Sequence, residues 1–154
     1  MALTTNKNFL SPVGFTLKID SNMANTEYFC TAANLPGISL SPVDSPFRGV
    51  NLGLTGDRLT FEDFSITFNI TENMENYIEI YNWMENIIQS SDPESFKYDA
   101  RLMILTSHNN VVKEIAFQEI FPTSLSSIEF NTQVGDIEYV QATVTFKYTL
   151  FEFS

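Results

Sequence analysis

The chain has 154 residues, of which 44% are hydrophobic, and its formal net charge is -11. This length favours a single domain with one core. With 8 Lys and Arg residues against 19 Asp and Glu residues, a surface that binds nucleic acid phosphates or an anionic membrane is not expected. Cys30 is the single cysteine, so the sequence excludes a disulfide within the chain.

The amino-terminal part is predicted to hold an arm and a pair of strands. Residues 1–13 are mostly polar, which predicts an arm before a single domain over 14–154. Apolar and polar residues alternate over 14–20, which predicts a strand. Residues 27–32 are predicted to form its antiparallel partner, across a turn that begins at Ser21.

Residues 34–58 hold more than half of the prolines and glycines of the chain, which predicts a long loop. Long loops in compact domains are usually functional or disordered. Apolar residues in this loop, among them Phe47, Val50 and Leu52, favour an ordered segment that needs a cover. A neighbouring subunit is the cover that we prefer, and the chain's own core is the alternative.

The charged pair Asp57 and Arg58 ends this segment. One interpretation is a salt bridge within the turn of a single subunit. The other is a bridge between subunits, in which the planar guanidinium group binds a carboxylate of the next copy. Together with Phe47, Val50 and Leu52, the pair forms our candidate contact between subunits.

Two segments, residues 63–70 and 140–150, alternate between apolar and polar residues. Successive side chains of a strand point to opposite faces, so each segment predicts a strand with one buried and one wet face. Phe64, Ile66 and Phe68 are predicted to lie in the core. The polar positions of interest are Asp63, Ser65, Thr67, Asn69, Gln141, Thr143, Thr145 and Lys147.

Between these strands the hydrophobic period changes to that of a helix, which we predict over about 73–90, with Thr71 or Asn73 as its cap. Residues 101–107 and 111–121 predict a hairpin. Pro122 and the serines after it are predicted to interrupt the sheet before a short strand at 128–130 and a last, longest strand. We therefore predict a mainly β fold: an antiparallel β-sandwich or barrel-like domain with one flanking α-helix.

A catalytic or metal site is not indicated by the sequence. His108 is the single histidine and lies in a predicted turn, where a solvated side chain is the simplest interpretation. One histidine and one cysteine do not make the usual zinc site. Glu114, Glu119 and Glu129 are carboxylates that lie on predicted strands, and without a cleft they do not indicate acid–base catalysis. We predict no enzymatic activity and no cofactor.

An ordered set of short motifs covers nearly the whole chain from about residue 14. The motifs are Cys30-Thr31-Ala32-Ala33-Asn34-Leu35-Pro36-Gly37, Gly56-Asp57-Arg58, Phe61-Glu62-Asp63-Phe64, Tyr81-Asn82-Trp83, Glu114-Ile115, Phe121-Pro122-Thr123 and Phe151-Glu152-Phe153. In this order and spacing the chain resembles the tail tube protein of contractile-tailed (T4-like) bacteriophages.

The resemblance implies a structural virion protein. Six subunits would form a ring and pool their strands into a continuous inner β-barrel, and stacked rings would form the tube of a contractile tail. The implied partners are further copies of the chain, the tail sheath, baseplate and tape-measure proteins, and double-stranded DNA that passes through the lumen during ejection without sequence-specific binding. The implied location is the virion tail, after assembly in the host cytoplasm, with no role for a membrane.

The polar positions of the two alternating strands are our candidates for the lumen wall. An acidic wall suits the passage of DNA, because attraction to many phosphates would hold the genome back. Lys147 departs from this scheme, and pairing with a nearby carboxylate would reconcile it. The opposite face of the strands remains an alternative lining.

Other functions stay open at this point. The nearest alternatives are a tube initiator of the baseplate and the tube protein of a related contractile injection or secretion system. A β-barrel that binds a small apolar ligand among its phenylalanines is a further alternative of a different class.

Overall fold

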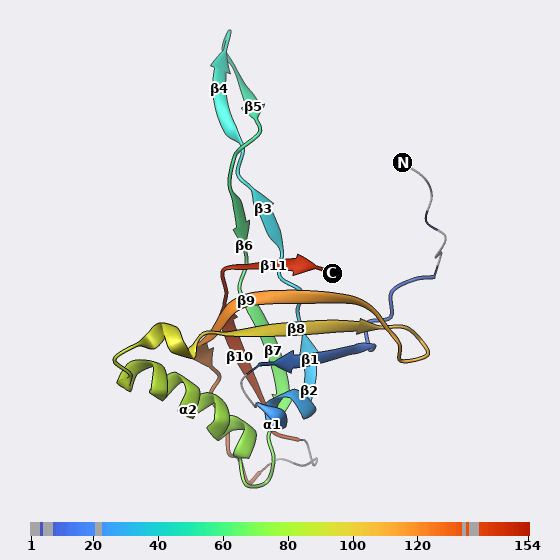
Figure 1. Cartoon of the computed structure of the whole chain (residues 1–154), viewed down its shortest axis with the longest axis vertical. Helices are drawn as coiled ribbons and strands as arrows, with labels where there is room; N and C mark the ends of the chain where they lie inside the picture. Colours follow the sequence, from blue (N-terminus) through green and yellow to red (C-terminus); the bar gives the residue numbers. More distant parts are fainter. Residues whose placement is uncertain (1–3, 5–7, 21–22, 134, 136–138) are drawn as a thin grey trace.

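The computed structural model describes residues 4, 8–20, 23–133, 135 and 139–154. A body of antiparallel strands lies at one end of the chain's long axis, and a narrow two-stranded arm extends from it (Figure 1). Seven strands of the body follow the order β1-β8-β9-β10-β7-β2, with β11 also paired to β9. Their bounds are β1 Phe15–Ile19, β2 Cys30–Ala33, β7 Phe64–Asn69, β8 Tyr98–Leu105, β9 Val111–Leu125, β10 Gln141–Lys147 and β11 Leu150–Phe153.

The long strand β9 belongs to both layers of the body. Its first part pairs with β8 and β11, and its last residues pair with β10. Between the two parts, Glu119 has a left-handed backbone with φ of 56°, and the register with β8 shifts between Tyr98 and Ala100. This local irregularity turns the strand, so that β1-β8-β9-β11 and β9-β10-β7-β2 fold over one another.

The core lies between these two layers, as the alternation of the strands predicts. Phe64, Phe68, Phe117 and Phe146 are fully buried, and the Phe64 and Phe117 rings stack with their centroids 4.4 Å apart. The other buried apolar residues are Leu17, Ile19, Ile66, Ile80, Trp83, Ala100, Leu102, Ile115, Ile120, Ala142, Val144 and Phe151.

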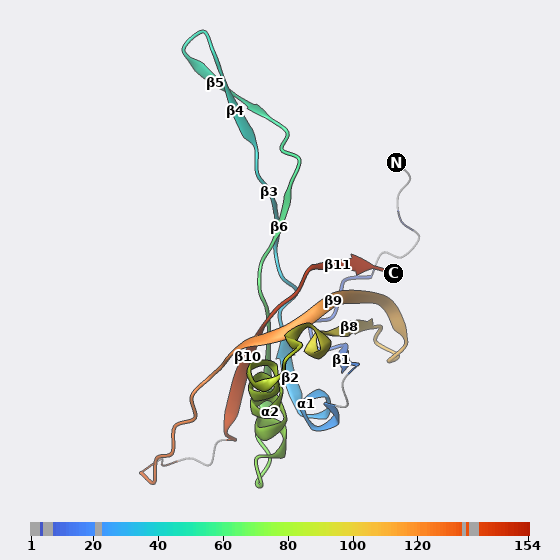
Figure 2. The ribbon, with the colours of Figure 1, turned by 60° about the vertical axis from the view of Figure 1, so that its left-hand side comes forward.

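The main helix, α2 (Glu75–Gln89), covers one open side of the sandwich (Figures 1 and 2). Ile80 and Trp83 are buried on its inner face. The indole Nε1–H of Trp83 donates to the carbonyl of Phe96, 2.7 Å away, in the short 3-10 helix η1 (Pro93–Phe96). Of the described helices, none combines the length and the apolar composition that a membrane span requires.

The amino-terminal elements differ from the sequence prediction. Strand β1 pairs with β8 rather than with the segment at 27–32, and β2 pairs with β7. A short helix, α1 (Ala24–Tyr28), stands between them. The Glu79 carboxylate of α2 explains it, because Asn25 Nδ2 and Thr26 Oγ1 donate to that carboxylate. The predicted turn at Ser21 lies outside the described residues.

The segment 34–58 is not a loop. It forms two short antiparallel pairs in succession, so the distal part is a β-hairpin with its turn at Arg48 and Gly49. The bounds are β3 Ile38–Leu40, β4 Val43–Phe47, β5 Val50–Leu54 and β6 Leu59–Phe61. The prolines and glycines that predicted a loop lie at the turn, at the break between the two pairs and within the two-stranded arm. The strands of the arm pair with no other strand among the described residues.

The carboxyl-terminal half agrees with the prediction in part. The hairpin of β8 and β9 around His108 is confirmed. Strand β9, with 15 residues, is the longest strand and continues through Pro122. Proline fits there because the register of β10 shifts between Thr145 and Phe146, beside it. The predicted last strand is divided into β10 and β11, and residues 128–130 form no strand.

Candidate assembly surfaces

One face of the β10–β7 pair is lined by small polar side chains that meet in register. The apolar partners of the same strands are buried, so the polar face is opposite the core. Three side-chain pairs join the strands across this face: Asn69 with Gln141 at 3.0 Å, Thr67 with Thr143 at 3.2 Å, and Ser65 with Thr145 at 3.4 Å. The sequence prediction that these six side chains share a face is therefore consistent with the register.

The same face extends over the neighbouring strands. Ser124 of β9 lies opposite Thr145, and Ala32 of β2 lies opposite Thr67. Ser124 and Ala32 are both exposed. Sequence reasoning did not assign these two residues to the face, and for Ser124 the reason is that a serine cluster after a proline is typical of a turn. The pairing of β9 with β10 identifies Ser124, and the pairing of β2 with β7 identifies Ala32.

Asp63 and Lys147 lie at one end of the polar face. They flank Phe64 and Phe146, which form the last paired position of β7 and β10. Both side chains are exposed, and Lys147 forms no ion pair with any carboxylate in the described part of the chain. The described residues on the face thus carry one cation, at its rim, and the centre of the face is uncharged.

The distal hairpin of the arm exposes apolar side chains, and the register of β4 with β5 places Phe47, Val50 and Leu52 on one face. Phe47 is 53% exposed and Val50 is 63% exposed, and Leu52 is exposed as well. The guanidinium group of Arg48 lies over the Phe47 ring, 5.5 Å from its centroid, at the tip of the hairpin. The body of the same subunit does not cover the arm, so the chain's own core is excluded as the cover in this conformation.

Asp57 and Arg58 are exposed where the arm returns toward the body. Neither residue forms an ion pair with any residue that the structure describes. The interpretation of a salt bridge within the turn is therefore wrong for this structure. The bridge between subunits stays a prediction.

Aromatic rings anchor the root of the arm to the body. Phe61, at the end of β6, contacts Tyr148 and Phe151 with ring centroids 6.1 and 5.2 Å away. The Tyr148 hydroxyl donates to the carbonyl of Glu62 over 2.7 Å. Burial, followed by the negative charges of Asp63 and Glu62, raises the pKa of Tyr148 to about 12. The phenol therefore stays protonated as a donor at neutral pH.

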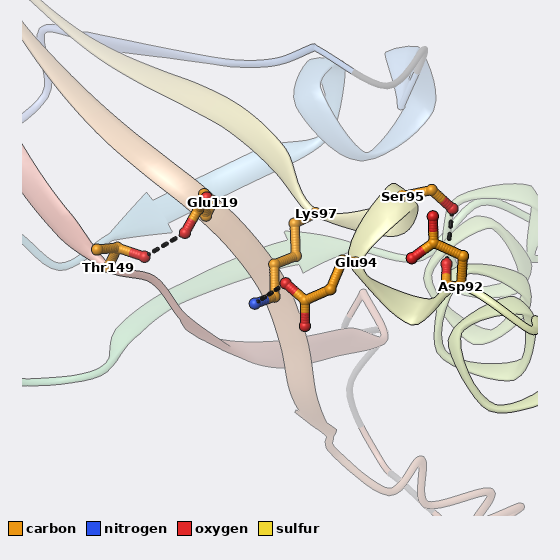
Figure 3. Close-up of polar contacts among 6 residues, drawn as sticks. All are labelled: Asp92, Glu94, Ser95, Lys97, Glu119 and Thr149. Atoms are coloured by element: carbon orange, nitrogen blue, oxygen red, sulfur yellow. Dashed lines mark hydrogen bonds and ion pairs between the residues drawn. The ribbon is translucent and has the colours of Figure 1, made fainter.

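A second polar cluster supports the bend of β9 (Figure 3). The Thr149 hydroxyl donates to the Glu119 carboxylate over 2.6 Å. Beside it, Lys97 forms an ion pair with Glu94, and the ammonium group lies over the Phe121 ring. These contacts hold η1 and the connection between β10 and β11 against β9, so their role is structural.

The residues weighed as catalytic candidates do not come together. His108 is exposed in the β8–β9 turn, where its Nδ1 lies 3.3 Å from Ser107 Oγ. Glu119 is engaged by Thr149, while Glu114 and Glu129 lie on other parts of the chain. Among the described residues, no group of three His, Cys, Asp or Glu side chains has the arrangement of a metal site.

Comparison with known proteins places this arrangement in a family. The family described as "Phage tail tube protein" matches residues 3–154. The chain belongs to this family. The predicted family is therefore confirmed, and it is a family of structural tail tube proteins.

Individual tail tube relatives support the assignment. The tail tube protein of Serratia phage KSP90 is 31% identical over 121 residues, which span 75% of this chain and 67% of that protein. The tail tube terminator protein of Enterobacteria phage T4 is 25% identical over 130 residues, which span 77% of this chain and 72% of that protein.

A solved structure shares the tail tube fold. It shows a sheath/tube terminator of the PVC extracellular contractile injection system in its extended state, with a TM-score of 0.74 and 16% identity. The similarity covers 97% of this chain and 99% of that one. The predicted fold class, a mainly β antiparallel sandwich with one main helix, is confirmed.

Proposed function

We propose that the chain is a structural virion protein whose hexameric rings stack into the inner tube of a contractile phage tail. The observation that carries the proposal is the sheet β9-β10-β7-β2, which has the core on one face and in-register, almost uncharged polar pairs on the other. A monomer does not require the outer face of a core sheet to be uniformly polar and almost uncharged, whereas a continuous channel wall requires such a face.

The direction of the strands suits closure into a ring. Each strand of the set β9-β10-β7-β2 is antiparallel to the next. The two outer members, β2 and residues 121–125 of β9, therefore run in opposite directions. When copies are related by rotation about a common axis, β2 of one copy can add to β9 of the next as one more antiparallel pair. Such closure removes exposed sheet edges, which otherwise favour aggregation.

The chemistry of the polar face suits a DNA channel. Proteins that hold DNA neutralise its phosphates with Lys and Arg. On the proposed lumen wall, the candidates Ser65, Thr67, Asn69, Gln141, Thr143 and Thr145 are uncharged, and Asp63 and Lys147 lie at the rim. Double-stranded DNA and the tape-measure protein would then pass without being bound to a particular sequence or site.

The proposed tube also implies partners outside its lumen. The tail sheath protein would surround it and baseplate proteins would begin it, after assembly in the host cytoplasm. The exposed arm residues Phe47, Val50, Leu52, Asp57 and Arg58 are the proposed contacts between copies. Their exposure in the single subunit supports this role, because apolar side chains on an isolated ribbon need a partner.

A tube-end role is the second candidate. It is favoured by the 25% identity to the T4 tail tube terminator protein. A tube protein adds rings without limit, whereas a terminator or a baseplate initiator stops after one or a few. The length of the assemblies formed by the pure protein distinguishes the two, and the neighbouring genes would distinguish a phage tail from a related injection or secretion system.

A cysteine-protection experiment tests the lumen. In a Cys30→Ser background, Thr143→Cys places a thiol on the polar face, and Thr16→Cys places one at an exposed position of β1. In assembled tubes, we expect Thr143→Cys to react with a small maleimide but to be protected from a maleimide carrying a bulky polymer. Thr16→Cys, the matched control, should keep its reactivity to both reagents unless the sheath is present.

Dissociated subunits provide the second control, since both thiols should then react with both reagents. Equal reaction of Thr143→Cys with the bulky reagent in tubes and in free subunits would show that the polar face is not the lumen wall. A protein that stays monomeric at high concentration and with tail components present would contradict the proposed function as a whole.

A further inference from the structure

Two cations lie directly opposite each other on the outward face of the layer β1-β8-β9-β11. Lys18 of β1 is paired with Arg101 of β8 in the register, and both side chains are exposed. The next pair in the same register, Leu17 with Leu102, is buried in the core, so alternation places the two cations on the opposite, outward face. Like charges directly opposite each other destabilise a sheet. Folding of the single subunit therefore does not account for this pair.

Neither cation is neutralised by an acidic side chain in the described part of the chain. Lys18 and Arg101 form no ion pair there, and the other carboxylates of this face, Asp99, Glu114 and Glu152, are not paired with them. The whole chain has only 8 basic residues against 19 acidic ones. Two neighbouring cations without an acidic partner are therefore an unusual feature of this surface.

A depression beside Arg101 gives a ligand access to this cation. It has a volume of about 340 Å³, and its polar lining residues are Asp99, Arg101, Gln118 and Glu119. The two carboxylates of the lining already bind other groups at the bend of β9. Asp99 Oδ1 accepts from the amide of Glu119 over 3.2 Å, and the Glu119 carboxylate accepts from the Thr149 hydroxyl (Figure 3). The guanidinium group of Arg101 is thus the charged lining group that has no partner within the described ranges.

This arrangement fits a carboxylate ligand. A guanidinium group binds a carboxylate through two parallel hydrogen bonds, and a neighbouring ammonium group adds a further donor. The outward face lies across the core from the polar face of β10 and β7, which is the proposed lumen wall. A ligand of Arg101 and Lys18 would therefore approach from outside the tube, where the proposed neighbours of the chain are proteins.

We propose that Arg101 and Lys18 form a carboxylate-binding site for an acidic segment of a protein that packs on the outside of the tube. The inference rests on the proposed function for the direction from which the segment approaches, whereas both cations belong to a single subunit. A positive site on an acidic protein marks one position for an acidic partner. The site would therefore fix where that partner docks and in which register.

Binding of an acidic peptide to the free subunit tests the site. We expect a fluorescent oligoglutamate peptide to bind the wild-type subunit at low salt, as measured by fluorescence anisotropy. Arg101→Gln and Lys18→Gln should each weaken binding about tenfold or more, the effect of losing a hydrogen bond between charged groups. Arg101→Lys keeps the charge but not the planar fork, so its affinity should lie between those of the wild type and Arg101→Gln.

Lys113→Gln is the matched control. Lys113 is also exposed on a strand of this layer, but it lies opposite Ile104 and not beside Arg101. The substitution removes the same charge and should leave the affinity for the peptide unchanged. Equal weakening by Lys113→Gln would show that net charge alone acts and would overturn the site. Absence of binding to the wild-type subunit, or an affinity that Arg101→Gln does not change, would overturn it as well.

The melting temperature of the subunit separates a binding role from a role in the fold. Removal of one member of a like-charge pair should leave the melting temperature of Lys18→Gln and of Arg101→Gln unchanged or raise it. A lower melting temperature for these variants would assign the cations to the fold and overturn the site.

Tube formation separates the site from the proposed function. Arg101→Gln and Lys18→Gln should form tubes in wild-type yield, because an outside partner is not needed for assembly. Loss of tubes in these variants, with normal tubes from Lys113→Gln, would show that the carboxylate belongs to another copy of the chain and would overturn the outside partner. Failure of the wild-type chain to form rings or tubes would contradict the proposed function, while peptide binding by the subunit would still test the site.

Discussion

At the scale of single residues, Gly56 decides how the arm is built. A Cβ atom at this position would lie 1.7 Å from the carbonyl oxygen of Ser41 and 2.9 Å from its carbonyl carbon. The two segments of the arm therefore cross between the β3–β6 and β4–β5 pairs, and their backbones are in direct contact there. A Cβ atom added at Gly53, three residues earlier, would have no atom within 4 Å. Only one of the two glycines is required by packing.

Gly56→Ala is expected to redirect the distal hairpin and to impair assembly. The body should melt at nearly the same temperature, because the hairpin packs on none of the core residues. Thermal unfolding followed by circular dichroism, together with tube counts by electron microscopy, measures both effects. Gly53→Ala is the matched control and should assemble normally. Equal assembly of the two variants would show that the crossing of the chains does not matter.

At the scale of elements, Asn76 joins the main helix to the sheet. It is fully buried at the first turn of α2. Its Nδ2 group donates to the carbonyl of Asn69, and its Oδ1 accepts from the backbone of Thr71 and of Tyr77. The N-cap of α2 is Met74 rather than the predicted Thr71 or Asn73, but the Thr71 hydroxyl accepts from the amide of Glu75. This network positions α2 over the open side of the sandwich.

Asn76→Ala should lower the free energy of unfolding by about 1–3 kcal/mol, the cost of leaving buried polar groups without partners. Urea denaturation at neutral pH measures the change. Asn82→Ala, at an exposed position of the same helix, is the control and should change stability by about 0.5 kcal/mol or less. A result for Asn76→Ala within the range of the control would mean that water replaces the lost bonds.

At the scale of the whole molecule, the exposed charges are expected to affect assembly more than the stability of the single subunit. The described body residues carry most of the net negative charge, while the exposed pair Asp57 and Arg58 has no partner among the described residues. A surface ion pair contributes little to the stability of a single chain. Between rigid copies, the same pair fixes register and excludes wrong partners.

Charge reversal at either residue should therefore reduce tube formation while leaving the melting temperature of the subunit within about 2 °C, because exposed charges away from packing change stability little. The double variant Asp57→Arg with Arg58→Asp should restore assembly in part. Light scattering during polymerisation and thermal melting of the subunit measure the two effects. If both single variants polymerise at the wild-type rate, the residues do not join subunits.

The sequence predicted elements best where a short local pattern decides the structure. The period of 65–70 and 141–147 fixed which side chains share a face, because neighbouring side chains on a strand always alternate. The helix period predicted α2, on which Ile80 is buried. The strand predicted over 27–32 was right only from Cys30 on, where β2 begins. Its first residues belong to the helix α1, which depends on the Glu79 carboxylate, more than 50 residues away in the chain.

The amino-acid sequence by itself thus determined the faces of the strands, the main helix, the β8–β9 hairpin and, through ordered motifs, the family. Only the tertiary structure decided which strands pair, that residues 34–58 form an arm, and that Ser124 and Ala32 join the polar face. The physical reason is range: alternation and helical period act between neighbours in the chain. Strand pairing and the contact of Gly56 with Ser41 act between residues whose closeness no local pattern encodes.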